Sequence, residues 1–445
     1  MVRWWFYISM LVAGCLISCF ATSCHNEKPD LPGFEEDRLY KMAINFSTVT
    51  TRDGNMKVLE KIKTFRIIIT SMSSNSQEGE PDDMDGQTES KEIVQLNKLV
   101  TEESLASTFN YYLLWHTDLG TKNFYLFANE ESVGNLSYSN GISEETNLKT
   151  LLNSFEPGSD ASDLKSILTS AYFTPEYKEE SGNIYLPYTS MYEGIEMNEN
   201  YKSLEMYLVP VATKFIFNFV NYRQNPVYID GISINSTNVN SYLFANVGEN
   251  NMQMTLPNAT SSLYWVDWLA KVSELSHGNY GYSQNQSFNS LYGWIWDYNL
   301  PTPEDYYSYV FPITQLEIPG FSYPDNEDGN EGEEVEGTPG KYTAGPFYVP
   351  ESKVNLSLPD PDNDGRVTQK YCLTIGLKDS VTENKDVPEF NDVEIENLNA
   401  LFRNTCVIIN LVMRQGDVEI YAQITPWIVK KVNGWVTEGN KPNFL

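Results

Sequence analysis

The chain has 445 residues, and its 60 acidic residues outnumber its 30 basic ones, which gives a formal net charge of −30. So acidic a chain is a poor partner for nucleic acid, because phosphates need a basic face. The 3 histidines are scattered and the sequence holds no glycine-rich phosphate loop, so we expect neither an enzyme nor a cofactor.

Residues 1–23 have the composition of a bacterial secretion signal. Arg3 supplies a positive charge, a long apolar run follows, and two small residues precede Cys24. A cysteine after small residues resembles the lipobox of exported lipoproteins, in which the thiol is acylated, so we predict lipidation of Cys24. Cys15 and Cys19 are alternative lipobox cysteines, but each would leave an apolar stub on the mature chain.

Strands are predicted throughout the first half of the chain, after a polar and flexible leash at 24–38. Met42, Ile44 and Phe46 alternate with other residues at the period of a half-buried strand. Further strands are expected at 64–69 and 124–129.

Helices are few. One is expected to begin with Ser143 as its cap and to end before Pro157, and a second runs from Ser162 through Leu168. A third candidate helix spans 261–276, where apolar residues recur at helical spacing.

The second half of the chain shows two hairpin patterns. One joins the apolar runs 215–220 and 227–234, and the other joins 405–413 to 418–424 across a polar turn with Gly416. Helices and strands do not alternate, which excludes a parallel α/β sheet.

These elements indicate an all-β fold with small helical insertions, divided into two β-sandwich domains. The first domain is placed at 39–205 and the second at 206–427, and a tail follows at 428–445.

The loop at Asp360, Asp362 and Asp364 resembles the opening of a calcium site, with carboxylates at alternate positions. Tyr371 stands where the bidentate glutamate of such a site belongs, and the flanks have the pattern of strands. A polar hairpin loop is therefore the favoured interpretation, and we predict no metal.

Two further features stay open at this level. The stretch 280–311 is rich in tyrosine and tryptophan, and its rings, Trp294 and Trp296 among them, would stack on sugars if exposed or else form a packed core. Cys372 and Cys406 lie in apolar strand-like runs, where they either pair in an oxidising compartment or remain buried thiols.

The order of several short motifs resembles the fimbrillins, the shaft and accessory subunits of type V pili. A lipobox and a polar leash come first, and an alternating strand then ends at Arg52. The later motifs are Ala128-Asn129-Glu130-Glu131, Leu186-Pro187-Tyr188, Pro210-Val211-Ala212-Thr213-Lys214, Arg403-Asn404-Thr405 and Pro426-Trp427.

This resemblance implies two tandem transthyretin-like β-sandwich domains in a surface-exposed lipoprotein of the outer membrane. It also implies that an arginine-directed protease cuts after Arg52. The cut would displace the first strand, with Met42, Ile44 and Phe46, and another subunit's extended tail would fill the groove by strand exchange.

The resemblance makes the tail 428–445 a candidate donor strand, with Val432, Trp435 and Val436 as its apolar residues, although 428–436 is equally readable as a last native strand. The expected partners are other pilus subunits, the outer membrane through the lipid, and surface ligands of host or bacteria. The alternative function is that of a monomeric glycan-binding surface lipoprotein that uses the aromatic residues of 280–311.

Overall fold

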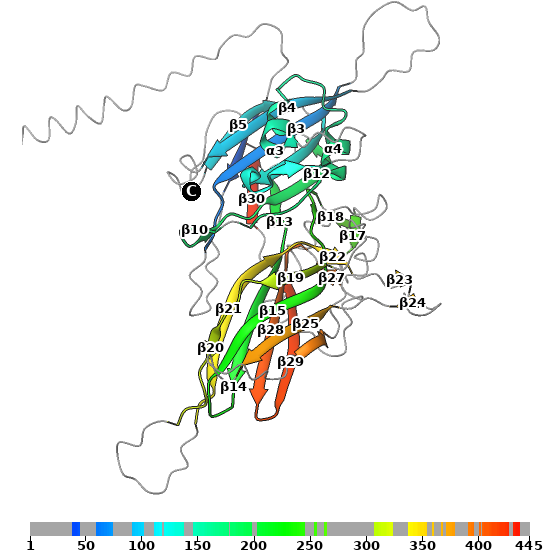
Figure 1. The fold of residues 1–445 in the computed structure, drawn as a ribbon. Coiled ribbons are helices and arrows are strands. Elements are labelled where there is room, and N and C mark those ends of the chain that lie inside the picture. Colours follow the sequence, from blue (N-terminus) through cyan, green and yellow to red (C-terminus); the bar gives the residue numbers. More distant parts are fainter. Residues whose placement is uncertain are drawn as a thin grey trace, which may run out of the picture. The chain divides into compact units, whose positions relative to one another are not determined.

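The fold is all-β with small helical insertions, as predicted (Figure 1). The computed structural model describes residues 38–44, 59–73, 91–101, 111–117, 120–137, 146–177, 179–197, 203–244, 253–255, 262–264, 307–323, 337–353, 358–359, 366–367, 371–378, 390–395, 400–401, 403–426 and 430–436. The chain falls into two units, Met1–Arg38 and Leu39–Leu445, and the features below belong to the second. No helix in the described ranges has the length and apolar character needed to cross a bilayer.

The largest sheet has eight strands in the order β4-β3-β6-β12-β13-β30-β1-β5. Their bounds are Lys91–Thr101 (β4), Thr64–Ser73 (β3), Gly120–Ala128 (β6), Tyr188–Met197 (β12), Ser203–Pro210 (β13), Lys430–Val436 (β30), Arg38–Ile44 (β1) and Tyr111–Thr117 (β5). β12 meets β13 through only two residue pairs, Tyr188↔Pro210 and Thr189↔Val209. This short contact joins two halves of four strands each.

Both faces of β3, the strand expected at 64–69, are buried. Phe65, Ile67 and Ile69 lie in one core, and Ile68 lies in a second core on the opposite face. The second face is covered because leucines of two short helices pack against it.

The helices are shorter than predicted. α3 spans Leu148–Asn153, and its cap is Asn147, whose side chain accepts a hydrogen bond from the Lys149 backbone, so the predicted start at Ser143 is wrong. α4 spans Leu164–Ser170, close to the prediction, and a 3₁₀ turn, η1, spans Glu130–Ser132.

The candidate helix at 261–276 is contradicted at its start. Ser262–Tyr264 forms strand β18, which pairs antiparallel with β17 (Gln253–Thr255). Pairing with a neighbouring strand overrides helical spacing here, and residues 265–276 lie outside the described part.

Two further sheets are built from the second half of the chain. The four-stranded sheet has the order β21-β14-β28-β29, with bounds Gly340–Val349, Thr213–Asn221, Thr405–Arg414 and Asp417–Pro426. The five-stranded sheet has the order β19-β15-β25-β26, with bounds Tyr307–Phe311, Val227–Thr237, Cys372–Lys378 and Phe390–Glu394, and β20 (Leu316–Ile318) also pairs with β15. Aromatic rings connect the two sheets: the Phe311 ring of β19 lies 4.8 Å from Phe217 of β14 and 5.6 Å from Phe347 of β21.

The hairpin predicted between 215–220 and 227–234 is wrong. β14 pairs with β21 and β28, whereas β15 pairs with β19, β20 and β25. The segment between β14 and β15 instead passes from the four-stranded sheet to the five-stranded sheet. The buried Asn221 amide holds this segment in place by donating to the Asn225 and Pro319 carbonyls, at 3.0 Å each.

The hairpin predicted at 405–424 is confirmed. β28 and β29 pair across ten residue pairs, from Thr405↔Pro426 to Arg414↔Asp417. Gly416 turns the chain with φ 85°, a conformation that glycine adopts without the cost that a Cβ brings.

Short paired strands complete the fold. They are β2 (Leu59–Glu60), β10 (Glu179–Glu180) and β11 (Asn183–Ile184) in one sheet, and the pairs β7 (Asn135–Leu136) with β8 (Thr146–Asn147), β9 (Tyr172–Phe173) with β16 (Ser241–Tyr242), β22 (Ser352–Lys353) with β27 (Ala400–Leu401), and β23 (Leu358–Pro359) with β24 (Arg366–Val367).

Candidate functional site

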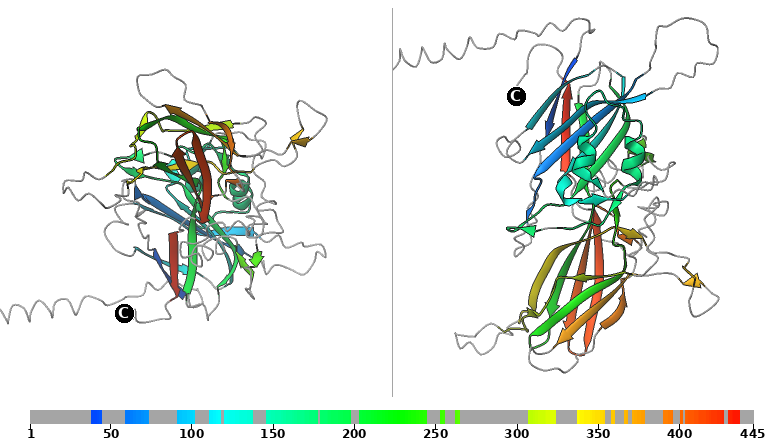
Figure 2. Two further views of the ribbon diagram at one scale, coloured as in Figure 1. Left: turned by 90° about the horizontal axis from the view of Figure 1, so that it is seen from below. Right: turned by 45° about the horizontal axis from the view of Figure 1, so that its top comes forward.

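The first described strand, β1, is an interior strand of the eight-stranded sheet. It lies between β30 and β5. It pairs antiparallel with β30 from Tyr40↔Val436 to Ala43↔Asn433. Figure 2 (right) shows the red β30 beside the blue β1, so strands from opposite ends of the chain are neighbours in the sheet.

β30 is paired along its other edge as well. It runs antiparallel to β13 through six residue pairs, from Ser203↔Trp435 to Leu208↔Lys430. Both edges of β30 are therefore hydrogen-bonded within this chain.

The position of β1 has a direct chemical consequence. An interior strand satisfies backbone donors and acceptors on two neighbours at once, so its removal leaves unpaired groups on both β30 and β5. Such an edge is a template for another extended chain. The site formed by β1, β30 and β5 is called the β1 slot below.

The sequence-predicted residues of the strand-exchange site fall partly in this slot. Met42 and Ile44 lie in β1, and Val432, Trp435 and Val436 lie in β30. The displaced strand and the candidate donor strand are thus neighbours. Several predicted site residues lie outside the described part of the chain: Cys24, Phe46, Arg52, Trp294, Trp296, Asp360, Asp362 and Asp364.

The flanks of the Asp360 loop pair as strands, Leu358↔Val367 and Pro359↔Arg366, as the hairpin interpretation predicts. Cys372 and Cys406 do not form a disulfide with each other, so the disulfide alternative is wrong.

Four of the motifs that carry the resemblance meet in one polar junction. Asn129 adopts a left-handed conformation, and its amide donates to the Leu186 carbonyl at 2.7 Å. The Val211 backbone donates to the Pro187 carbonyl at 2.8 Å, and the Asn404 backbone donates to the Ala212 carbonyl at 3.0 Å. These hydrogen bonds link segments of the eight-stranded sheet to the start of β14 and β28.

Arg403 directly precedes Asn404 of this junction. Its side chain is 0% exposed and forms an ion pair with Glu351, which is 0% exposed as well. Arg403 Nε donates to Glu351 Oε2 at 2.8 Å, and Nη2 donates to the Tyr242 carbonyl at 2.6 Å and to Glu351 Oε1. Nη1 donates to the Leu243 carbonyl at 3.2 Å. The guanidinium therefore fixes several chain segments at once, as its planar fork allows.

A second buried ion pair joins β2 to the four-stranded sheet. Lys214 Nζ lies 2.8 Å from Glu60 Oε1, and the Tyr348 hydroxyl donates to the same oxygen at 2.9 Å. Burial, and then the charge of Glu60, raise the pKa of Tyr348 well above its ordinary value. Glu60 comes directly after residues 45–58, which contain Arg52, so this ion pair anchors the chain just past that segment.

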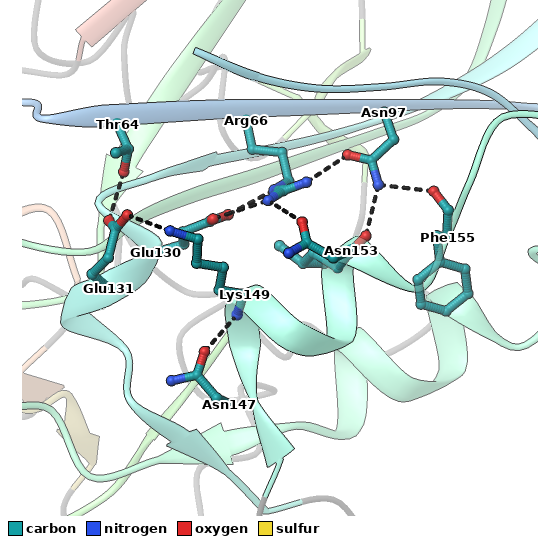
Figure 3. Close-up of polar contacts among 10 residues, drawn as sticks. Thr64, Arg66, Asn97, Glu130, Glu131, Asn147, Lys149, Asn153 and Phe155 are labelled. Carbon is teal, nitrogen blue, oxygen red and sulfur yellow. Dashed lines mark hydrogen bonds and ion pairs between the residues drawn. The ribbon is translucent and has the colours of Figure 1, made fainter. Parts of the chain in front are cut away.

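A third buried network stiffens the outer half of the eight-stranded sheet (Figure 3). Arg66 of β3 donates to both carboxylate oxygens of Glu130, at 2.7 and 3.0 Å. It also donates to Asn97 of β4 and to Asn153 of α3, at 2.8 Å each. Thr64 donates to Glu131 at 2.7 Å. The residues of this network lie in β3, β4, η1 and α3, and none of them belongs to β1.

A cavity of about 410 Å³ lies beside η1. The residues that line it include Asn135, Thr174, Glu176 and Asn240, and the aromatic residues Tyr172 and Phe173. Among the described residues that line it there are two glutamates and no lysine or arginine, which disfavours an anionic ligand and favours a neutral polar one.

No protein-family model and no curated protein matches the chain. Similar solved structures include the tip fimbrial protein Mfa3 from Porphyromonas gingivalis, with a TM-score of 0.41, 11% identity, and coverage of 88% of this chain and 100% of that chain. They also include the fimbrial anchor protein Mfa2 from the same organism, with a TM-score of 0.26, 9% identity, and coverage of 86% and 96%. The low identities and TM-scores leave the function to be inferred from the geometry of this chain.

Sequence reasoning missed two features of the site. The pairing of β30 with β13 and β1 joins segments from opposite ends of the chain, and local periodicity carries no signal for such a contact. The buried ion pair of Arg403 was also missed, because an arginine next to a predicted strand is usually exposed. The only available signal was its place in a motif of the resemblance.

Proposed function

We propose that this chain is a structural and adhesive subunit of a type V pilus, exported as a lipoprotein and assembled by strand exchange. The observation that carries the proposal is the position of β1, which is the first described strand and an interior strand of its sheet. The resemblance of the motifs to those of the fimbrillins supports the same function.

A cut after Arg52 would fall in the segment 45–58 between β1 and β2. β1 would then be held only by non-covalent contacts with β30 and β5. An incoming strand of similar pattern restores the backbone hydrogen bonds that β1 made, so replacement is close to neutral for the ladder. Each large apolar side chain that is buried again contributes about 1.5–3 kcal/mol.

The rest of the fold is built to survive this cut. The buried pair of Glu60 and Lys214 holds the chain immediately after the cut segment, and the network of Arg66 holds the outer half of the sheet. A cleaved subunit would therefore keep its body and lose only β1.

In this proposal the lipid on Cys24 anchors the protein only temporarily, during export. The acyl chains bring the precursor to the outer membrane, and the lipid leaves together with the first strand. The two-domain division at 39–205 and 206–427, with a transthyretin-like topology in each domain, belongs to the same proposal.

The decisive experiment begins with N-terminal sequencing of the protein from cells, where we expect a start at Asp53. Purified precursor is then cut with an arginine-specific protease and mixed with a synthetic peptide of residues 39–51 that carries a fluorophore. We expect the cut protein to bind the peptide and the uncut variant Arg52→Gln to exclude it. A surface protein that keeps residues 39–51, together with a cut protein that binds no strand, would refute the proposal.

Glycan binding is the second candidate function, and the cavity beside η1 favours it. Asparagine, serine, threonine and aromatic residues form the mix of groups that holds a neutral sugar, and the volume of about 410 Å³ suits one or two sugar units. Binding to a polysaccharide panel that is lost in Asn240→Ala and kept in Trp294→Ala would place the sugar here. The opposite result would place it in the aromatic stretch 280–311.

A further inference from the structure

We propose that this chain accepts a strand from a neighbouring subunit while its own β30 stays in the eight-stranded sheet, so that β30 is not a donor strand. The inference rests on the proposed function and adds a role within it. It comes from the pairing of β30, which closes this chain's own sheet.

A subunit within a shaft must do two things: open an edge for an incoming strand and extend a strand of its own. The last described strand of this chain is not free for the second task. β30 is joined to β13 by six residue pairs and to β1 by four. Loss of β1 would remove only the second set, and the six pairs with β13 would keep β30 in place.

The route of the chain points the same way. β29 ends at Pro426 in the four-stranded sheet, and β30 begins at Lys430 in the eight-stranded sheet. Residues 427–429 alone connect the two strands, so β30 follows directly from a strand that is paired along its whole length with β28. Donation would require β30 to leave β13 and would open a second gap in the same sheet.

The edge that β1 vacates defines the partner. The incoming strand must run antiparallel to β30, as β1 does, with apolar residues at alternate positions such as those of Met42 and Ile44. Gly434 stands opposite Met42 in the register. A glycine across the ladder is stabilised by a large side chain on the facing strand, so the partner strand should carry a large apolar residue at that position.

Two matched disulfide locks test the inference in the full chain. The first lock joins β13 to β30 through Met206→Cys and Val432→Cys, which are paired in the register, and thereby forbids donation. The second lock joins β1 to β30 through Lys41→Cys and Trp435→Cys, which are also paired, and thereby forbids acceptance. Peptide mapping confirms each disulfide before the cut after Arg52.

The readouts are uptake of the fluorescent peptide 39–51 and the formation of multimers by the cut protein alone. We expect the first lock to bind peptide within about twofold of the unlocked protein, and the two proteins to form multimers to the same extent. The second lock should reduce uptake by at least tenfold and recover when it is reduced. Homopolymers of the unlocked protein that the first lock abolishes would show donation and overturn the inference while the pilus function stands.

Another result would contradict the proposed function itself and not only this inference. If the cut, unlocked protein takes up no peptide and forms no multimer, the strand-exchange function itself fails. A peptide variant with Met42→Gly should bind at least tenfold more weakly than one with Ile44→Val, because only the first leaves Gly434 without a large neighbour. Equal binding of both peptides would overturn the assignment of the partner's large residue.

Discussion

β29 and β30 follow each other in the chain, but β29 pairs with a strand that is near in sequence and β30 pairs with strands that are far away in sequence. β29 pairs with β28, its immediate predecessor, through a tight turn at Gly416. β30 pairs with β13 and with β1, the first described strand. A local hairpin closes a short loop, whereas the pairing of β30 must close almost the whole chain. The hairpin can therefore form from local contacts, whereas β30 can pair only after the distant strands β13 and β1 have come together.

The two strands also differ in how they are anchored. The hairpin begins directly after Arg403, whose charge is buried against Glu351 and several carbonyls. That anchor is specific to these residues. The ladder between β1 and β30 uses backbone groups that any extended chain can supply, which suits exchange.

The largest expected effect is at the anchor of the hairpin. Arg403→Ala leaves Glu351 buried without its cation, and we expect a loss of about 3–5 kcal/mol in the free energy of unfolding. Urea denaturation followed by tryptophan fluorescence measures it.

The matched control is the double variant Arg403→Met with Glu351→Leu. It removes both charges at similar volume, so it should recover most of the lost stability. A single variant that loses less than about 1 kcal/mol would mean that the anchor is not specific.

Truncation after Pro426 tests the other strand. Without β30 the amides of β13 and β1 that bond to it lose their partner and should exchange at the rate of unpaired backbone, while those of β28 keep their protection. Hydrogen exchange read by mass spectrometry resolves the strands. Equal loss of protection in β28 would erase the distinction between the two strands.

Alkaline pH should act on two buried tyrosines, Tyr188 of β12 and Tyr348 of β21. Burial, and then the charge of Glu60, hold the pKa of Tyr188 and Tyr348 well above the ordinary value of 10.0. The folded protein keeps these phenols neutral, so stability is full below pH 10.0 and is lost as pH rises from there through the folded pKa.

Absorbance of tyrosinate at alkaline pH measures this together with circular dichroism. The buried phenols should ionise only as the sheet unfolds, whereas Tyr188→Phe and Tyr348→Phe together should move unfolding to higher pH. Ionisation of all tyrosines in one smooth step, before any unfolding, would contradict the expectation.

The smallest expected effect is in the turn of the hairpin. Gly416→Ala places a Cβ at φ 85°, where it costs about 1 kcal/mol, and the open space around the position adds no clash. Thermal melting measures the change. The matched variant Gln415→Ala should shift the melting temperature by less than half as much.

Sequence alone was sufficient for features encoded in neighbouring residues. The β28–β29 hairpin follows from two apolar runs around a turn with glycine, and β6 follows from its aromatic run. Contacts between residues far apart in the sequence could not be predicted from it. β14 and β15 have the pattern of a hairpin, but the pattern does not say which sheet each strand joins.

For the same reason, the candidate site could be predicted only in part from the sequence. Met42 and Ile44 could be assigned to a strand from their alternation, but the neighbours of that strand could not be inferred, because pairing with β30 depends on the opposite end of the chain. The Arg403 ion pair lacks a local pattern as well, since Glu351 is far away in sequence.

The antiparallel ladder of β1 and β30 also has a mechanical consequence. A pull along the strand that occupies the β1 slot loads its backbone hydrogen bonds side by side, because they lie across the direction of tension. They must then break together, whereas a pull across the strand would open them one after another. An occupied slot should therefore resist a lengthwise pull, such as shear from flowing liquid, better than a pull across the strand.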